Sequence, residues 1–181
     1  MGLLVEGQWK DQWHETDDKG HFVREASKHR RWITPDGGVG PNGQPELKTE
    51  TGRYHLFVSL ACPWAHRTLI YRKLKGLEAC IGVTVVSWLM KENGWTFDTE
   101  RGASGPYVKL HKYLYQLYTT DTNDFSGRVT VPVLWDLAEN RIVNNESADI
   151  IRIFNSAFDE LTGNALDLYC LLYTSPSPRD S

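Results

Sequence analysis

The central part of the chain alternates between apolar runs and amphipathic segments. The run Tyr54–Ser59 is short and apolar, and Ile81–Trp88 is rich in β-branched residues, so both predict strands. Between them, Pro63–Lys75 is amphipathic and predicts a helix that ends at Gly76, a residue typical of helix C-termini. Two strands that bracket one helix form a βαβ unit, which favours a parallel strand pair.

A second set of elements follows a polar, glycine-containing loop at 90–106. Apolar positions in Val108–Thr120 recur at helical spacing, and Val131–Asp136 and Arg141–Asn144 predict an antiparallel hairpin. Ser147–Phe158 then predicts a closing helix. The resulting order, β-α-β-α-β-β-α, defines an α/β chain with a thioredoxin-like fold. We expect this domain to span residues 51–160, with 161–169 as the start of a linker.

Residues 1–50 show no sustained helical or strand period. Tryptophan and phenylalanine occur among charged residues there, at Trp9, Trp13, Phe22 and Trp32, and turn signals are dense from Thr34 to Gly43. A disordered tail is usually poorer in aromatic residues. We therefore expect an irregular arm that packs over the domain through its tryptophans.

Composition excludes several functional classes. The chain of 181 residues is 40% hydrophobic and 24% charged with a net charge of −3, which gives no electrostatic case for nucleic acid or an anionic membrane. No apolar run approaches the roughly 20 residues that cross a bilayer. The three cysteines, Cys62, Cys80 and Cys170, are widely spaced and suggest neither a disulfide framework nor a zinc site. These features favour a reduced, cytoplasmic compartment and no metal.

Cys62 stands where the first strand turns into the first helix. With Pro63 at the first helical position, Cys62 occupies the N-cap, where unpaired N–H groups favour a negative sulfur and helix N-termini lower thiol pKa values. A small buried hydrophobic residue is the alternative interpretation. The β-α-β-α-β-β-α order favours the interpretation of Cys62 as a reactive thiol, because the turn from the first strand to the first helix carries the reactive group of thioredoxin-like folds. Cys80, between helix and strand, is expected to be an inert buried thiol.

The site is predicted to work with one thiol. The second cysteine of a Cys-X-X-Cys pair would stand at position 65, which is Ala65. A mixed disulfide on Cys62 therefore needs an outside thiol, and glutathione is the abundant small one. Arg67 and Arg72, on the same helix, are interpreted as solvated helix charges.

The segment 53–68, which reads Arg-Tyr-His-Leu-Phe-Val-Ser-Leu-Ala-Cys-Pro-Trp-Ala-His-Arg-Thr, closely resembles the active-site segment of glutathionyl-hydroquinone reductases, also called xi-class glutathione transferases. The resemblance extends from about Trp32 to Tyr169. It includes the stretches 31–37, 94–97, 131–136 and 145–150. Cys-Pro-Trp-Ala with such long matching flanks is a far more specific signal than Cys-Pro alone.

The resemblance implies a two-step reaction with glutathione as co-substrate. The Cys62 thiolate attacks the sulfur of a glutathionyl-hydroquinone, which releases the hydroquinone and leaves a mixed disulfide. A second glutathione then regenerates the thiolate and forms oxidised glutathione. The rivals are an omega-like glutathione thiol transferase or dehydroascorbate reductase, and a non-catalytic thioredoxin-like binding module. A conjugating transferase would use Ser or Tyr, so Cys62 argues against it.

Six further residues are expected to bind glutathione. Val131, before Pro132, can present its backbone to the cysteinyl part of glutathione if the bond between them is cis. Ser147 and the helix N-terminus suit the γ-glutamyl carboxylate, and Glu146 can pair with the ammonium. The resemblance adds Trp95 by stacking and Arg128 by charge. Ordinary helix capping is the alternative role for Glu146 and Ser147, and a core-covering loop aromatic is the alternative for Trp95.

The family pattern stops near Tyr169. In relatives this segment leads into an all-helical C-terminal domain, which supplies part of the hydroquinone-binding wall and much of the dimer contact. We expect that domain to be missing here and a family-like homodimer to form only in the full-length protein. Residues 170–181 resemble one reading frame of a sequencing adaptor, and we interpret them as a non-native tail; a natural Ser/Pro-rich tail is the alternative.

Overall fold

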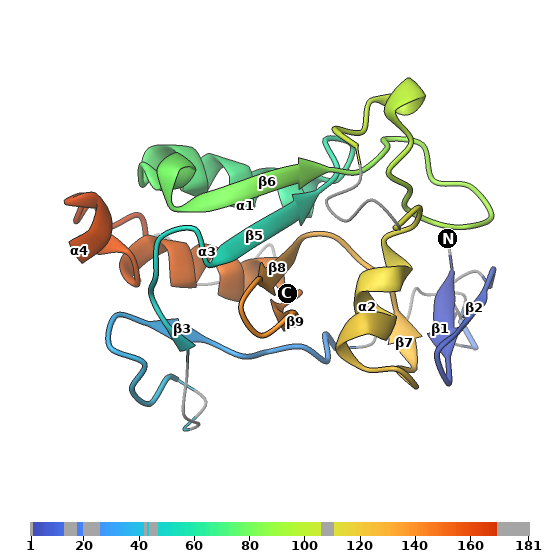
Figure 1. Ribbon diagram of the computed structural model, residues 1–181, viewed down its shortest axis with the longest axis horizontal. Coiled ribbons are helices and arrows are strands. Elements are labelled where there is room, and N and C mark those ends of the chain that lie inside the picture. Colours follow the sequence, from blue (N-terminus) through green and yellow to red (C-terminus); the bar gives the residue numbers. More distant parts are fainter. Residues whose placement is uncertain are drawn as a thin grey trace.

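The computed structural model describes residues 2–12, 18–19, 26–41, 43, 47–105 and 111–169. A four-stranded sheet in the order β6-β5-β8-β9 lies at its centre, as Figure 1 shows. It consists of β5 (Tyr54–Val58), β6 (Ile81–Val85), β8 (Val133–Asp136) and β9 (Arg141–Asn144). β5 pairs with β6 in parallel and with β8 antiparallel, and β8 pairs with β9 antiparallel. All five residues of β5 are buried, which accounts for its continuous apolar run.

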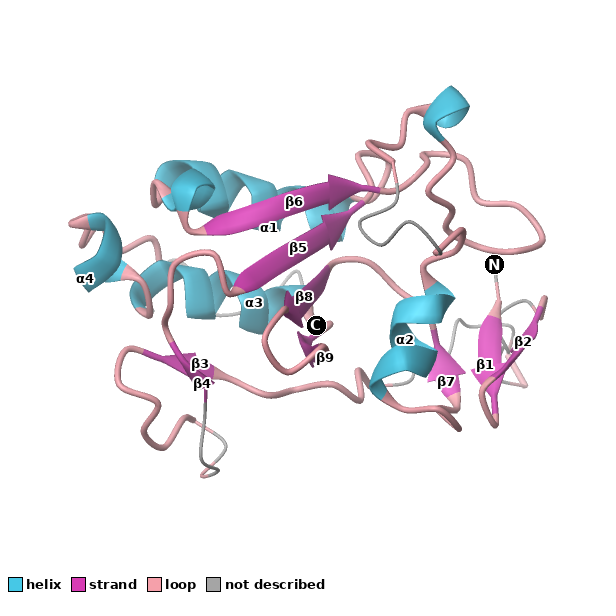
Figure 2. Ribbon diagram, in the orientation of Figure 1, coloured by secondary structure: helices cyan, strands magenta, loops and turns pink. Residues whose placement is uncertain are grey.

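Two helices pack against each other along this sheet (Figure 2). They are α1 (Pro63–Leu74) and α3 (Ser147–Ser156), and the short α4 (Asp159–Thr162) follows α3. α2 (Tyr115–Asp121) contacts β9 instead. The helix α1 ends as its sequence predicts, since Gly76 adopts a left-handed φ of 68°. The thioredoxin-like element order and the α/β class are thus confirmed.

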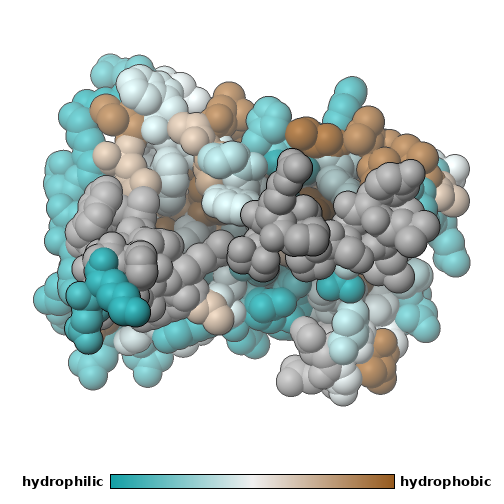
Figure 3. Space-filling view, turned by 180° about the vertical axis from the view of Figure 1, so that it is seen from behind, coloured by the Kyte–Doolittle hydropathy of each residue, from teal (hydrophilic) through white to brown (hydrophobic). Residues whose placement is uncertain are grey.

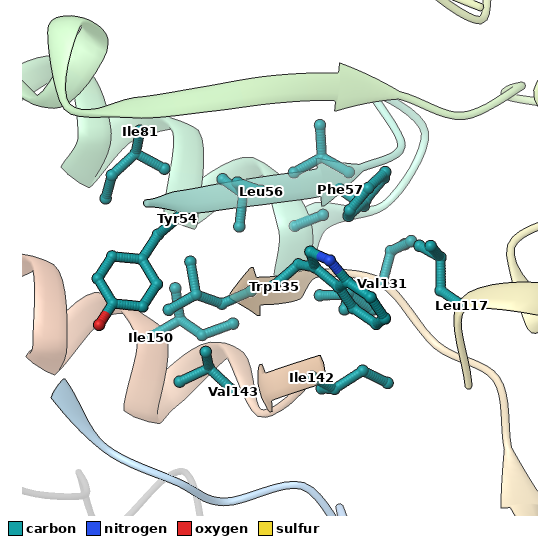
Figure 4. Close-up of a cluster of buried hydrophobic side chains, with 14 of the residues drawn as sticks. Tyr54, Leu56, Phe57, Ile81, Leu117, Val131, Trp135, Ile142, Val143 and Ile150 are labelled. Carbon is teal, nitrogen blue, oxygen red and sulfur yellow. The ribbon is translucent and has the colours of Figure 1, made fainter. Parts of the chain in front are cut away.

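The core fills the space between the sheet and the helices. Trp135 of β8 is the largest buried side chain, and in Figure 4 its indole extends past Val131 toward Leu117 of α2. Tyr54 and Ile150 occupy the other end of the same cluster, between β5 and α3. The core therefore reaches the loop that holds Val131, so core packing also fixes the backbone next to the site.

The predicted helix over Val108–Thr120 is only partly correct. α2 begins at Tyr115, and residues 106–110 lie outside the described residues. Before the helix, Tyr113 pairs with Thr96 in an antiparallel bridge, and the Gln116 side chain accepts hydrogen bonds from the N–H groups of Lys112 and Tyr113. Pairing with a loop distant in sequence holds this segment extended and overrides its helical spacing.

The N-terminal arm contains strands that its sequence does not indicate. β1 (Leu3–Val5) and β2 (Gln8–Lys10) form a hairpin, and β1 also pairs with β7 (Gly127–Arg128). A second, two-stranded sheet joins β3 (Ile33–Thr34) to β4 (Leu47–Lys48) in parallel. The expectation of an irregular arm is wrong at these positions. Strands of two or three residues are too short to show a periodic pattern.

Two tryptophans of the arm pack as expected. The ring of Trp9 stacks on Tyr115 with 5.0 Å between centroids, and its Nε1 donates to the Glu92 carbonyl at 2.8 Å. Trp32 packs against the hydrophobic core. Arg30 pairs through its guanidinium with the nearly buried carboxylate of Asp149 in α3. Trp13 and Phe22 lie outside the described residues.

The segment 164–169 is tied to the C-terminal end of α1. The buried ammonium of Lys75 donates to the Leu166 carbonyl at 2.6 Å and lies 2.9 Å from the Asp159 carboxylate. The Asn164 side chain donates to the Leu74 carbonyl at 2.9 Å. The division at residues 160 and 161 stays a prediction, and the proposed tail at 170–181 lies outside the described residues.

Apolar residues on the surface are scattered. Seen from behind, hydrophobic residues form separate areas along the upper edge, interrupted by hydrophilic ones (Figure 3). Trp64, Trp88, Leu161 and Leu166 are among the exposed large apolar side chains. In the described part of the chain, no helix is long and apolar enough to span a bilayer.

His55 of β5 makes the stability of the fold depend on pH. Its ring packs where a Cβ at Gly82 would stand, 2.6 Å from Nδ1, and its Nε2 shares a hydrogen bond of 2.8 Å with the Thr84 hydroxyl. Burial lowers the pKa of His55 to about 4, and the charge of Arg72 adds to this shift. Since an unfolded histidine has a pKa near 6.5, the unfolded chain binds the proton more readily.

We therefore expect the free energy of unfolding to fall by about 2 kcal/mol on this account between pH 7 and pH 5. The stabilisation that the neutral His55 side chain provides is complete above its pKa in the unfolded chain. It is lost as the pH falls toward its pKa in the folded chain. Urea unfolding of the unmodified chain and of His55→Gln at the two pH values measures it. Because glutamine does not titrate, the free energy of unfolding of the variant should fall less between the two pH values. Equal decreases in both proteins would contradict the role given to His55.

Candidate active site

Cys62 lies at the N-cap of α1, directly after a turn that leaves β5. Its backbone is extended, with φ −103° and ψ 114°, and Pro63 occupies the first turn of the helix. The turn closes through the Cys62 N–H, which donates to the Ser59 carbonyl at 3.1 Å. The His66 N–H donates to the Cys62 carbonyl at 2.9 Å, the first bond of the helix. The partly buried sulfur therefore stands where the helix N–H groups are unpaired, as the sequence predicts.

Val131 faces this sulfur from the loop before β8. The Cys62 thiol donates to the Val131 carbonyl, with 3.7 Å between Sγ and O, and the Val131–Pro132 bond is cis. Tyr118 holds the neighbouring residue of this loop: its hydroxyl donates to the Thr130 carbonyl at 3.0 Å and accepts from the Thr130 N–H at 3.2 Å. The structure thus brings together Cys62, Val131 and Pro132.

Glu146 and Ser147 begin α3, at a point where the chain leaves β9. Glu146 is the N-cap, and its carboxylate accepts from the Ala148 N–H at 3.3 Å and from the Ser27 hydroxyl at 3.0 Å. The Asn144 side chain accepts from the Glu146 N–H at 2.7 Å. Ser147 is almost fully buried at the first helical position. Capping, the alternative role that the sequence left open, is therefore a real role of Glu146, whose carboxylate binds the Ala148 N–H at the start of α3.

Arg67 joins these two parts of the site, contrary to the interpretation of a solvated charge. Its Nε and Nη2 both donate to the Ser147 hydroxyl oxygen, at 3.1 and 2.6 Å. Nη2 also lies 3.9 Å from the Glu146 carboxylate. Arg72 is also bonded, since its Nε donates to the Ile81 carbonyl at 2.7 Å. No local pattern could reveal the Arg67 contact, because its partners lie about 80 residues away.

The two remaining predicted ligands make their described contacts elsewhere. Trp95 is partly buried against the core, and its carbonyl accepts from the Leu114 N–H at 2.9 Å. Arg128 belongs to β7, opposite Leu3, and its Nη1 donates to the Gln12 carbonyl at 2.6 Å. Both side chains therefore have structural contacts of their own, and their role toward glutathione stays a proposal.

The second described cysteine differs from Cys62 in its surroundings. Cys80 is buried at the end of a 3₁₀ turn, whereas Cys62 is partly exposed; both are free thiols. Within the described ranges, no three histidine, cysteine, aspartate or glutamate side chains are grouped so that they could hold a metal ion. A cavity of about 390 Å³ is lined by the loop 89–101 and residues 111–113, and Cys62 is not among its lining residues.

Together, the thioredoxin-like sheet and the single thiol at the start of α1 point to one class of protein. A family model described as the glutathione S-transferase N-terminal domain matches residues 61–157, so the chain belongs to the glutathione S-transferase family. Within that family the similarity is to glutathionyl-hydroquinone reductases and to xi-class transferases, as the sequence resemblance implies.

Comparisons with two known proteins show how far the similarity extends. The glutathionyl-hydroquinone reductase YqjG of Escherichia coli is 56% identical over 171 residues, which are 93% of this chain and 52% of that protein. The glutathione-bound structure of YqjG superposes with a TM-score of 0.79 over 96% of this chain and 51% of its own. The structure of a xi-class transferase from Natrialba magadii superposes with a TM-score of 0.79 and is 42% identical in sequence. This match covers 99% of this chain and 50% of the transferase chain. The chain spans about half the length of these relatives.

Proposed function

We propose that the Cys62 site removes glutathione from glutathionyl-hydroquinones. The observation that carries this proposal is the thiol at the N-terminus of α1, which is the one partly exposed thiol in the described part of the chain and has Ala65 where a resolving cysteine would stand. A thiol without a neighbouring partner is regenerated by an outside thiol. The similarity to a glutathionyl-hydroquinone reductase, and to a relative solved with glutathione, supports both the substrate and the co-substrate.

The proposed first step transfers the glutathionyl sulfur to Cys62. The thiolate forms a disulfide with this sulfur, and the carbon–sulfur bond of the substrate breaks. The aromatic carbon keeps the electron pair and takes a proton, so the hydroquinone is released. The two sulfurs are oxidised to a disulfide while the carbon is reduced.

The proposed second step restores the thiolate. A glutathione thiolate attacks the glutathionyl sulfur of the mixed disulfide, and Cys62 leaves with the electron pair. The thiol proton of this second glutathione balances the proton taken up by the aromatic carbon. One glutathionyl-hydroquinone and one glutathione thus give one hydroquinone and one oxidised glutathione.

Glutathione binding is proposed to use the predicted residues in distinct roles. The Val131 backbone, beside the sulfur, takes the cysteinyl part, while Ser147 and Glu146 take the γ-glutamyl carboxylate and ammonium. Trp95 and Arg128 complete the contacts by stacking and by charge. An extended peptide-like ligand would then run from the start of α1 to the start of α3.

A single-turnover experiment tests the proposal. The reduced chain is mixed with a glutathionyl-hydroquinone in the absence of free glutathione, and we expect one hydroquinone released per chain together with one glutathionyl group on the protein. Adding glutathione should then allow repeated release, with oxidised glutathione formed in equal amount. If the chain takes glutathione from a glutathionylated peptide but releases no hydroquinone, the site is that of an omega-like thiol transferase.

A further inference from the structure

We propose that Arg67 is a positioning residue for the γ-glutamyl end of glutathione, acting through the Ser147 hydroxyl. This inference rests on the proposed function, because it assumes that glutathione lies between Cys62 and the start of α3. Arg67 belongs to the same helix as Cys62, whereas Ser147 begins α3. The contact between them therefore links the nucleophile to the anion-binding end of the second helix.

The hydrogen bonds define how the Ser147 hydroxyl is oriented. A serine oxygen has two acceptor lone pairs and one O–H group. Arg67 donates to this oxygen twice, from Nε at 3.1 Å and from Nη2 at 2.6 Å, so the positive edge of the guanidinium faces the lone-pair side of the oxygen and the O–H group points away from it. The O–H proton is then left to donate to an acceptor. Ser147 is thereby set to bind a carboxylate, not an ammonium group.

The charges around Ser147 match the two charges of a γ-glutamyl group. Arg67 supplies a positive charge next to the hydroxyl, and the Glu146 carboxylate lies 3.9 Å from its Nη2. A carboxylate on the Ser147 side and an ammonium on the Glu146 side would each meet an opposite charge. A ligand that lacks both the carboxylate and the ammonium would form neither of these two ionic interactions.

Packing keeps the Arg67 side chain in place. The guanidinium lies 5.0 Å from the centre of the Trp64 ring, on the same helix, and its side chain is 32% exposed. A planar guanidinium held over an aromatic ring loses little further freedom when two of its N–H groups bond to one acceptor. A lysine ammonium is a single point charge and cannot reproduce the pair of hydrogen bonds that Nε and Nη2 make together.

Competition between two disulfides measures the effect. The rates at which Cys62 forms a mixed disulfide are followed by mass spectrometry with oxidised glutathione and with the disulfide of N-acetylcysteinylglycine, which lacks the γ-glutamyl charges. We expect the unmodified chain to react faster with oxidised glutathione. In Arg67→Gln the ratio of the two rates should fall about tenfold, and in Arg67→Lys it should take an intermediate value. Lys73→Gln removes one exposed charge from the same helix and should leave the preference unchanged.

A neutral third reagent, 2-hydroxyethyl disulfide, separates positioning from general damage. Its rate should change less than twofold in all variants. The inference is overturned if Arg67→Gln keeps the preference, if its rates with all three disulfides fall in parallel, or if Lys73→Gln loses as much. A chain that forms no glutathione adduct on Cys62 would instead overturn the proposed function.

Discussion

Replacing Cys62 by serine is expected to reduce hydroquinone release in the single-turnover experiment by at least about a thousandfold. A serine hydroxyl cannot form the mixed disulfide that the proposed reaction requires. The fold should be retained, because the hydrogen bond that Sγ makes within the described residues is a weak one, to the Val131 carbonyl at 3.7 Å. Hydroquinone measured by chromatography, with protein mass measured in the same sample, gives both readouts.

Cys80→Ser is the matched control for this prediction. Cys80 is 5% exposed, so its thiol is shielded from dissolved reagents, and its loss should leave hydroquinone release unchanged. Circular dichroism of both variants checks that they fold. If Cys62→Ser keeps its release while Cys80→Ser loses it, the nucleophile has been assigned to the wrong cysteine.

Replacing Arg53 by methionine is expected to lower the free energy of unfolding by about 3 kcal/mol. Arg53 Nη2 lies 2.7 Å from the carboxylate of Asp136, which is fully buried at the end of β8. Without the guanidinium, a buried charge keeps, among the described residues, the N–H groups of Ala138 and Glu139 as donors. Urea unfolding at neutral pH measures the loss.

Arg31→Met is the matched control for Arg53. Arg31 pairs with Glu139 at 2.7 Å, but both side chains are about one-third exposed, at 34% and 37%. Exposed pairs contribute less than about 1 kcal/mol. In a double variant, Asp136→Asn removes the stranded charge and should recover part of the Arg53→Met loss. Equal small losses for Arg53→Met and Arg31→Met would contradict a stabilising buried pair.

The same pair sets the response to acid. Burial by itself raises the pKa of Asp136, but the hydrogen bonds from Arg53 and from the N–H groups of Glu139 and Ala138 outweigh it, and the pKa is lowered overall. A carboxylate whose pKa is lower in the folded chain stabilises the fold above the unfolded pKa, near 4. This contribution is lost as the pH falls through the folded pKa.

Those parts of the fold that depend on local chemistry could be predicted from the sequence. Proline is compatible with the first turn of a helix but not with its interior, so Pro63 marks the start of α1. Gly76 adopts the left-handed conformation that follows the end of the helix. The bounds of α1 therefore follow from these two residues. The buried run of β5 and the β-branched residues of β6 predict the parallel pair that is observed. The position of Cys62 follows from these neighbours alone.

Other features depend on partners distant in sequence, and no local pattern indicates them. The hairpin of β1 and β2 becomes a three-stranded sheet because β1 also pairs with β7, more than 100 residues later. The start of α2 is set by the bridge between Thr96 and Tyr113. Arg67 has the spacing of a solvated helix residue, yet α3 brings Ser147 to its guanidinium. The position of the proposed nucleophile can therefore be predicted from the sequence, whereas Arg67, which joins it to the start of α3, can be identified only from the fold.

The central claim is that Cys62 is the thiol that carries glutathione. The most direct test is peptide mass mapping after the reduced chain has been exposed to oxidised glutathione at neutral pH. We predict one glutathionyl group on the peptide that contains Cys62, none on the peptide that contains Cys80, and full reversal by reduced glutathione. A chain in which Cys62 stays unmodified, or in which Cys80 carries the adduct, would contradict the account.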